Sequence, residues 1–293
     1  MNILLALDGS PSSLVARDLV AGLSWPEATT VDLLAAYQTP IDWSGGMAPA
    51  DWMGEVDEAT RGQLAEDLEA AAAPLLQHGL AVERHVVAGR PATEIVAAAH
   101  ARDAALVVMG SRGRGPLRSM LLGSVAGEVT AHAACPVLVA RHPTVTRLVV
   151  ATDGSAGAEL IPDRLAALGA FTGVPADVVA VSIPDTPTFE LIVGLYTLGD
   201  ERLSHRRQEL RQRFAAAADR MVERLTAVGI PATGHVRAGD PAHEVLALAR
   251  EREADLVVTG SRGLGALDRL LLGSVARNVL HHATASVLVV GHP

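Results

Sequence analysis

The chain contains no lysine, because all 24 of its Lys and Arg residues are arginine. This absence excludes P-loop nucleotide hydrolases, whose loop lysine contacts the phosphates, and it excludes any mechanism with a Schiff-base lysine or a lysine general base. A single cysteine, Cys135, excludes an intrachain disulfide and is typical of a reducing cytoplasm. Aromatic residues make up only 3% of the chain, so alanine, valine and leucine must build its core.

Long apolar runs and basic stripes are also missing from the sequence. No stretch approaches the roughly 18 apolar residues of a membrane span, and the opening MNILLALDGS resembles a first strand more than a signal peptide. The formal net charge of −9 argues against a nucleic-acid partner, because phosphate contacts need clustered cations. We therefore expect a cytoplasmic protein that binds neither nucleic acid nor a membrane.

Two stretches of the chain are near-copies of each other. Val107–Ala140 and Val257–Val290 agree at 20 of 34 aligned positions, and both carry the spacing G-x2-G-x9-G-S. Duplication of this kind, in a chain of 293 residues, predicts two domains of ordinary size. We expect them over residues 1–141 and 146–293, joined by a short linker.

Short apolar runs alternate with helical patterns in the same order in both halves. Such runs are typical of strands buried on both faces of a parallel sheet. The predicted fold class is therefore α/β, with two tandem open doubly wound domains that each contain a five-stranded parallel sheet. The predicted strands are Ile3–Leu7, Val31–Tyr37, Val82–Val87, Ala105–Met109, Val137–Ala140, Leu148–Ala151, Val178–Val181, Ile230–Val236, Leu256–Thr259 and Ser286–Val290.

Helices are predicted between these strands. The longest are expected over Glu55–Gln77 and Asp200–Ala227, and residues 39–54 are expected to form a loop. In sheets of this type, ligands bind beyond the carboxyl ends of the strands, where the strand order reverses. Both the Asp-Gly-Ser turns and the glycine loops follow strands, so both are expected at that edge.

The glycine loop is the strongest candidate for a binding site. Gly110 and Gly113 lack a Cβ, which allows the backbone to approach a ligand closely. Gly123 and Ser124 come just before a helix, whose free N–H groups and dipole favour an anion such as phosphate. A flexible surface loop that binds nothing is the plainer interpretation, but the recurrence at Gly260, Gly263, Gly273 and Ser274 counts against it.

Two further side chains recur in each half, and two interpretations stay open for each. Arg112 and Arg262 occupy the same loop position and either pair with phosphate as a fork or simply face solvent. Asp8 and Asp153 follow the first strand of each half. They either accept a hydrogen bond from a ligand or hold a metal through phosphate, or they cap the next helix.

Other nucleotide and hydrolase motifs fit less well. A dinucleotide-binding enzyme would need a third glycine where Arg118 and Asp268 stand, and its loop would follow the first strand rather than the fourth. The G-x-S-x-G turn of serine hydrolases does not occur.

The Asp-Gly-Ser start, the G-x2-G-x9-G-S loop with its GSRG and LGSVA cores, and the final VLV strand together resemble a tandem universal stress protein. The resemblance covers essentially the whole chain, twice. Family members with this loop spacing bind ATP, so the resemblance implies an ATP-binding protein of the stress response. The nucleotide-binding residues that it implies are Ala6, Asp8, Ala36, Gly110, Arg112, Gly113, Gly123, Ser124 and Val125, with Ala151, Asp153, Val181, Gly260, Arg262, Gly263, Gly273, Ser274 and Val275 in the second half.

The expected function is that of a nucleotide-responsive binding or signalling module with little turnover, and we assign no catalytic residue. A slow ATP hydrolase or nucleotidyl-transfer enzyme is the alternative. It is the less favoured of the two, because no general base stands out beside the loop. The expected cofactor is ATP, either alone or with Mg²⁺ or Mn²⁺ bound through its phosphates.

Two expectations concern the relation between the halves. The resemblance implies that the two fifth strands pair within the chain, and it leaves room for a further homodimer. The sites are expected to differ, because residues 1–145 carry a formal charge of −7 and residues 146–293 a charge of −2. We expect the second site to bind ATP more tightly, with Val181 in place of Ala36. The two extra hydroxyls of the first turn, on Ser12 and Ser13, favour the first site instead, because they offer hydrogen bonds to the ligand.

Overall fold

The computed structural model describes residues 1–38, 50–113, 122–182, 200–263 and 272–291. The chain divides into two compact units, the first mainly Met1–Thr144 and the second made of Val145–Ala167 and Phe171–His292. Within the described parts, no helix combines the length and apolar character that crossing a membrane requires.

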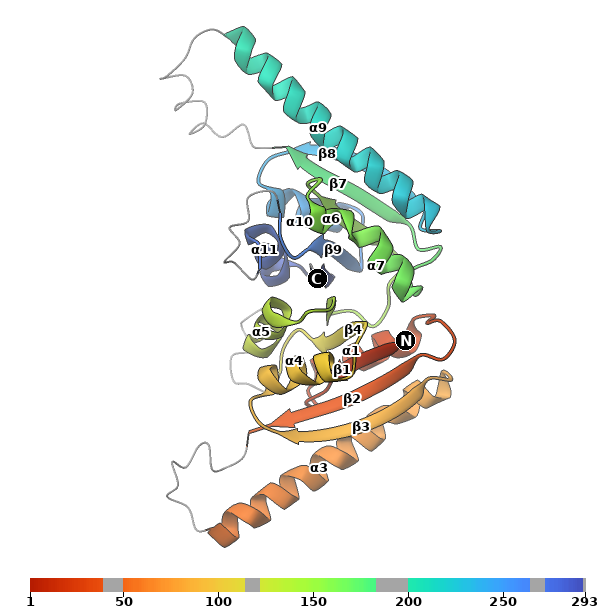
Figure 1. Cartoon of the computed structure of the whole chain (residues 1–293), viewed down its shortest axis with the longest axis vertical. Coiled ribbons are helices and arrows are strands. Elements are labelled where there is room, and N and C mark those ends of the chain that lie inside the picture. The colour runs from red at the N-terminus through yellow and green to blue at the C-terminus, as the bar shows by residue number, and fades with distance from the viewer. Residues whose placement is uncertain (39–49, 114–121, 183–199, 264–271, 292–293) are drawn as a thin grey trace. The chain divides into compact units, whose positions relative to one another are not determined.

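The first unit is a five-stranded parallel sheet with helices between its strands (Figure 1). Its strand order is β3-β2-β1-β4-β5, and the strand pairs are parallel. The elements are β1 (Asn2–Ala6), α1 (Pro11–Gly22), β2 (Thr30–Tyr37), α3 (Ala50–Gln77), β3 (Ala81–Ala88), α4 (Pro91–Ala101), β4 (Leu106–Gly110), α5 (Ser124–His132) and β5 (Val137–Ala140).

The second unit repeats this plan with the strand order β10-β9-β6-β7-β8, again with parallel pairs. The predicted α/β class with doubly wound parallel sheets is therefore confirmed. The elements are β6 (Leu148–Thr152), α6 (Ala156–Glu159), α7 (Ile161–Leu168), β7 (Ala176–Ser182), α9 (Asp200–Ala227), β8 (Ala232–Ala238), α10 (Pro241–Glu251), β9 (Leu256–Gly260), α11 (Ser274–His282) and β10 (Ser286–Val290).

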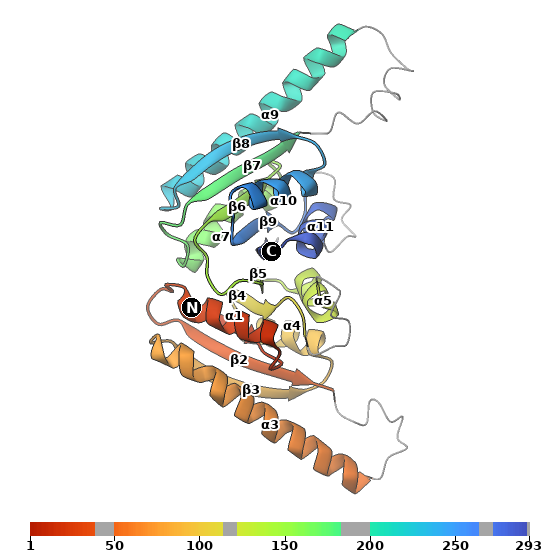
Figure 2. The same cartoon turned by 180° about the vertical axis from the view of Figure 1, so that it is seen from behind.

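Helices cover both faces of each sheet, which explains why the central strands are continuously apolar. In the first unit α1 packs on β1, β4 and α3, and α3 runs along β2 and β3, whereas α4 packs on β2 and α5. The two views from opposite sides show α4 and α5 in front of the sheet in one case and α1 in front of it in the other (Figures 1 and 2). Ile3, Leu4 and Leu5 of β1 are accordingly fully buried.

Several predicted strand boundaries were wrong by one or two residues, and the start of the longest helix of the first half was wrong by five. Helix α3 begins at Ala50 rather than Glu55, so part of the predicted loop is helical, while residues 39–49 lie outside the described residues. Strand β8 begins at Ala232 rather than Ile230. The N–H of Ile230 donates instead to the carbonyl of Leu225, which closes the end of α9, and Pro231 has no N–H to offer a ladder.

The helix after the first strand is continuous in one unit and broken in the other. Helix α1 runs over 12 residues, whereas its counterpart is divided into α6 and α7 at Leu160. Pro162 accounts for the break, because it cannot donate to the carbonyl four residues earlier. The two halves therefore differ beside the first strand, where the Asp-Gly-Ser turn lies.

Candidate functional site

The glycine loop and the Asp-Gly-Ser turn of each half leave neighbouring strands at the same edge of the sheet. Asp8 follows β1 and Ser111 follows β4, and these two strands are paired. The chain then continues to α1 on one face and α5 on the other, so the strand order reverses between β1 and β4. In the second unit, β6 and β9 have the same relation. This is the edge at which open α/β sheets bind their ligands.

A hydrogen bond within the turn fixes each aspartate. The Oδ1 of Asp8 accepts from the backbone N–H of Ser10 at 3.0 Å, and Ser10 in turn caps α1 through its hydroxyl. In the second half, Asp153 accepts from the N–H of Ser155 at 2.9 Å, and Ser155 caps α6. The helix-cap interpretation of the two aspartates was therefore wrong, because the serine two residues later is the cap.

The aspartate of each turn lies against the second glycine of the loop, Gly113 or Gly263. A Cβ built on Gly113 would lie 2.7 Å from the Oδ2 of Asp8, and one built on Gly263 would lie 2.6 Å from the Oδ2 of Asp153. Both distances are shorter than any ordinary contact of a Cβ. Only glycine fits at these two positions without moving the carboxylate, so turn and loop form one continuous surface.

Gly110 and Gly260 have a different reason to be glycine. A Cβ on Gly110 would lie 2.6 Å from the carbonyl carbon of Ser12, because the end of β4 packs directly on the start of α1. The close approach at Gly110 is thus to the protein itself. At Gly260 the nearest atom, the backbone nitrogen of Ala158, would be 3.3 Å away, so the second half is less tightly packed at this point.

The loop returns to its own beginning before the next helix starts. The N–H of Gly123 donates to the carbonyl of Ser111 at 2.7 Å, and that of Gly273 donates to Ser261 at 2.7 Å. Gly123 is the N-cap residue of α5, and among the described residues no side chain caps this helix. In the part of the second half that the structure describes, helix α11 likewise begins after Gly273 without a side-chain cap. The free N–H groups of the first helical turns, which are of a kind that suits anions, therefore adjoin the loop.

The helix residues assigned to the site fall on these first turns. Ser124 and Ser274 are the first helical residues, and Val125 and Val275 are the second. Ser124 is exposed and Val125 is partly buried. The hydroxyl of Ser124 does not act as the helix cap, since Gly123 takes that position.

Arg112 and Arg262 are both exposed on the loop. The carbonyl of Arg112 accepts from the hydroxyl of Ser10 at 3.3 Å, which attaches the loop to the turn. The first half has a second guanidinium close by. Burial lowers the pKa of Arg141 to about 10, and the positive charge of Arg112 adds to this effect. Two cations therefore share the surroundings of the first loop.

The four remaining assigned residues line the strands near the turn. Ala6 and Ala151 lie on the first strand of each half, and Ala36 and Val181 near the end of the second. Ala6 of β1 lies beside Leu34 of β2, and Ala36 follows Leu34 by two residues. The side chains of Ala6 and Ala36 therefore lie on the same face of the sheet, the face that α4 covers. Ala36 is partly exposed, whereas Ala6, Ala151 and Val181 are buried.

The two extra hydroxyls of the first turn are engaged with the protein. Ser12 lies 3.3 Å from the hydroxyl of Ser111 and accepts from the N–H of Arg112 at 3.2 Å. Ser13 donates to the carbonyl of Ser10 at 2.9 Å. These hydroxyls hold the turn against the loop. In the second half Gly157 replaces Ser12, and a Cβ there would lie 3.2 Å from the carbonyl of Arg262.

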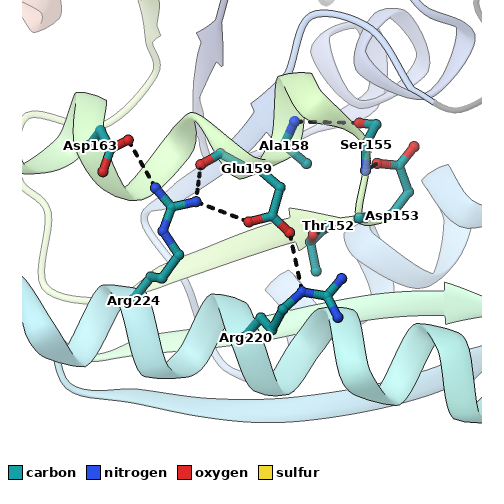
Figure 3. A network of polar contacts seen from close by, with 9 residues as sticks. Thr152, Asp153, Ser155, Ala158, Glu159, Asp163, Arg220 and Arg224 are labelled. Atoms are coloured by element: carbon teal, nitrogen blue, oxygen red, sulfur yellow. Dashed lines mark hydrogen bonds and ion pairs between the residues drawn. The ribbon is translucent and has the colours of Figure 1, made fainter.

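A polar network that the sequence did not predict stands beside the second turn, and the described residues of the first half have no equivalent (Figure 3). Arg224 of α9 donates to Glu159 at 2.9 Å and to Asp163 at 2.8 Å, and Arg220 lies 3.6 Å from Glu159. A Cβ on Gly154 would lie 3.6 Å from the Nη2 of Arg220, which places this guanidinium beside the turn. The spacing of the two arginines, four residues apart on one helix face, was the available signal.

Apolar contacts take the place of this network in the first unit. Leu14 stands where the second half has Glu159, and it lines a small recess of about 20 Å³ together with Gly9, Leu68 and Asp67. The recess is no larger than a water molecule, so it is a packing feature rather than a nucleotide site. Its one acidic member, Asp67, corresponds to Ala217 of α9.

Comparison with known proteins identifies the same family in both halves of the chain. The model of the universal stress protein family matches residues 1–141 and 144–291. A universal stress protein of Mycolicibacterium smegmatis is 30% identical over 227 residues, which cover 73% of this chain and 70% of that protein. Universal stress protein Rv2005c of Mycobacterium tuberculosis is 31% identical over 218 residues, which cover 72% and 69%.

A solved structure is similar over the full length. It is a universal stress protein from Archaeoglobus fulgidus, 23% identical, with a TM-score of 0.65, and the match covers 100% of this chain and 98% of that one. At this level of identity, the similarity supports the fold alone.

The different packing of Gly110 and Gly260 generates a prediction about stability. We expect Gly110→Ala to lower the free energy of unfolding by about 1–3 kcal/mol, because the new Cβ must displace the backbone of Ser12. Gly260→Ala should cost less than about 1 kcal/mol, since its neighbours need to move only slightly. Urea unfolding measures both, with Gly62→Ala as the control, because a Cβ there meets nothing within 4 Å. Equal costs at Gly110 and Gly260 would contradict the packing argument.

Proposed function

Because the chain belongs to the universal stress protein family, with one match to the family in each half, we propose that it is an ATP-binding protein of the stress response. Each half holds one nucleotide at the carboxyl edge of its sheet. The nucleotide state changes what the protein binds, and turnover is slow or absent.

The observation that carries this proposal is the meeting of three elements at one edge, twice in the chain. The aspartate turn touches the glycine loop at Gly113 and Gly263, and the loop adjoins the uncapped start of α5 or α11. Backbone N–H groups in a loop and at a helix start are suited to phosphate oxygens. Exposed Arg112 and Arg262 add a fork of donors to each site.

The other end of the ligand is assigned to the second strand. The partly exposed Ala36 and the buried Val181 lie near the ends of β2 and β7, where an adenine ring would pack. Asp8 and Asp153 are the carboxylates that the loop approaches. Carboxylate oxygens suit Mg²⁺ and Mn²⁺, so an ion carried by the phosphates fits this position.

We further propose that β5 and β10, the end strands of the two sheets, pair with each other within the chain. Both are buried along their whole length and apolar except for Ser286, and an open strand edge is a template for pairing with another strand. Hydrogen exchange tests this: the outward-facing amides of both strands should be protected in dilute, monomeric protein, and rapid exchange of these amides would refute the pairing. Sedimentation of the intact chain measures separately whether two chains associate into a homodimer.

Substitution of the two loop glycines tests the nucleotide site. In the double variant Gly113→Ala, Gly263→Ala, each new methyl group must push the aspartate carboxylate aside, which closes the surface that a phosphate would approach. Calorimetric titration with ATP should show affinity lowered by about ten-fold or more at both sites. Gly62→Ala is the matched control, because its Cβ would enter open space.

Unchanged ATP affinity in the double variant would refute the assignment of the glycine loop as the phosphate-binding part of the ATP site. The same titration mixture separates the two functional alternatives. If the protein binds ATP without turnover, labelled ATP is recovered intact after long incubation. Catalytic release of ADP that the double variant abolishes would instead establish the slow hydrolase.

The unequal surroundings of the two turns give a prediction about affinity. Arg220 stands beside the second turn with a side chain that is 53% exposed, whereas the first turn has Asp67 nearby and Ala70 in place of the arginine. Arg141 favours the first site, but it is partly buried, whereas Arg220 is largely exposed. We therefore propose that the second site binds ATP more tightly.

The test removes one site at a time. In a Gly113→Ala background, Arg220→Ala should weaken ATP binding by roughly five-fold, about the contribution of one exposed charged contact. Arg213→Ala, on the same helix and also exposed, should have no effect. Equal effects of the two arginine variants, or a stronger first site in single-glycine variants, would show that the local charge does not set the order.

A further inference from the structure

A second polar constellation recurs in both halves, at the opposite edge of the sheet from the glycine loop. Asp32 is the third residue of β2 and Asp177 the second of β7, and both are almost fully buried. Each aspartate faces a histidine of the next strand, His85 or His235. Asp32 precedes Ala36 by four residues, a separation of roughly 13 Å along a strand, so this constellation is distinct from the proposed nucleotide site.

The first half adds a third metal-binding side chain to the pair. The Nε2 of His85 lies 3.2 Å from the Oδ1 of Asp32 and 3.6 Å from the Oε2 of Glu83. The register places Glu83 beside Asp32 and His85 beside Leu34, so all three side chains share one face of the sheet. Arg84 points to the other face, where it pairs with Glu69 of α3.

These spacings match what one small cation requires. Ligand atoms about 2.1 Å from a tetrahedral ion are about 3.4 Å from one another, close to the two distances from His85. Asp32 Oδ1, Glu83 Oε2 and His85 Nε2 all lie within 4.8 Å of one another. The Glu83 side chain is 66% exposed and that of His85 is 25% exposed, so water has access to a fourth position.

The outer oxygen of Asp32 is already oriented by neighbours. The Nδ2 of Asn2 donates to Asp32 Oδ2 at 2.7 Å, and the Nε of Arg102 lies 3.6 Å from the same oxygen. Support of this kind, on the oxygen that does not face the ion, is usual for ligating carboxylates. The Oδ1 of Asn2 is buried and has no hydrogen-bond partner among the described residues.

The second half provides an internal comparison. Among the described residues, Arg102 pairs with Asp32, and Glu83 adds a second carboxylate. Asp177 pairs instead with two arginines, Arg147 and Arg252. Thr233 replaces Glu83, and each oxygen of Asp177 lies within 3.3 Å of a cationic or histidine nitrogen. The second constellation therefore has one potential ligand fewer, and both oxygens of its aspartate are already paired.

We propose that Asp32, Glu83 and His85 form a binding site for a divalent transition-metal ion, with Zn²⁺ as the best match, in the first half only. One imidazole nitrogen with two carboxylate oxygens suits Zn²⁺ and its neighbours, whereas Mg²⁺ and Ca²⁺ prefer oxygen ligands alone. The ion joins β2 to β3, and Arg102 at the end of α4 supports the site from outside. This site is independent of nucleotide binding.

Titration of the full-length, nucleotide-free, chelator-treated protein with Zn²⁺ tests the proposal. Calorimetry should detect one tight Zn²⁺ per chain, and Co²⁺ in its place should give the visible absorption of a tetrahedral site. Glu83→Thr introduces the residue of the second half and should lower Zn²⁺ affinity at least about ten-fold. Because Glu83 is largely exposed, this variant should keep the wild-type urea midpoint. Glu66→Gln, on exposed α3 surface, is the matched control and should bind as the wild type does.

Several results would overturn the proposal. Absence of tight Zn²⁺ binding by the wild-type chain would do so, and so would unchanged affinity in Glu83→Thr. If His85→Ala removes binding while Glu83→Thr does not, the ion is held without Glu83 and the three-ligand site is wrong. Since His85→Ala also leaves the buried Asp32 with less support, its urea midpoint is compared with that of His235→Ala, the equivalent change in the second half.

Discussion

In each half, the aspartate of the Asp-Gly-Ser turn lies against the second glycine of the loop, Gly113 or Gly263. Both candidate nucleotide sites depend on this contact. A carboxylate oxygen occupies the space that a Cβ at Gly113 or Gly263 would need. This contact joins two segments about 100 residues apart in sequence and brings them to the edge where the strand order reverses. The serine caps, the return of the loop through Gly123 and Gly273, and the uncapped helix starts are all arranged around it.

The two halves keep this contact but support it differently. In the first half, serine hydroxyls tie the turn to the loop, and apolar side chains of α1 and α3 pack behind it. In the second half, Gly157 brings the backbones together directly, Pro162 divides the helix, and arginines of α9 pair with Glu159 and Asp163. The same divergence appears at the opposite edge, where Glu83 is acidic and its counterpart Thr233 is not. After duplication, the shared geometry has been kept while the charge around each site has changed.

Much of the fold was predictable from local pattern, because strands buried on both faces appear as short apolar runs, and the duplication doubles that signal. The glycines of the loop were also predictable, although the reason for Gly110 was not, since it depends on the backbone of Ser12 across the sheet. The start of β8 was misplaced because the hydrogen bond of Ile230 to Leu225 competes with the strand ladder. The spacing of Arg220 and Arg224 indicates one helix face, but the sequence does not reveal their acidic partners on α6 and α7. The Asp32–Glu83–His85 group could not be recognised either, because its members come together only when neighbouring strands are placed in register.

The number of ATP molecules bound per chain tests the central claim most directly. Native mass spectrometry of the purified protein with excess ATP should detect two bound nucleotides, filled in sequence, and the denatured sample should release them as intact ATP. Two unequal sites would follow from the duplicated contact and its different surroundings. A chain that remains free of nucleotide under these conditions would contradict the account, because the geometry common to both halves would then have no ligand.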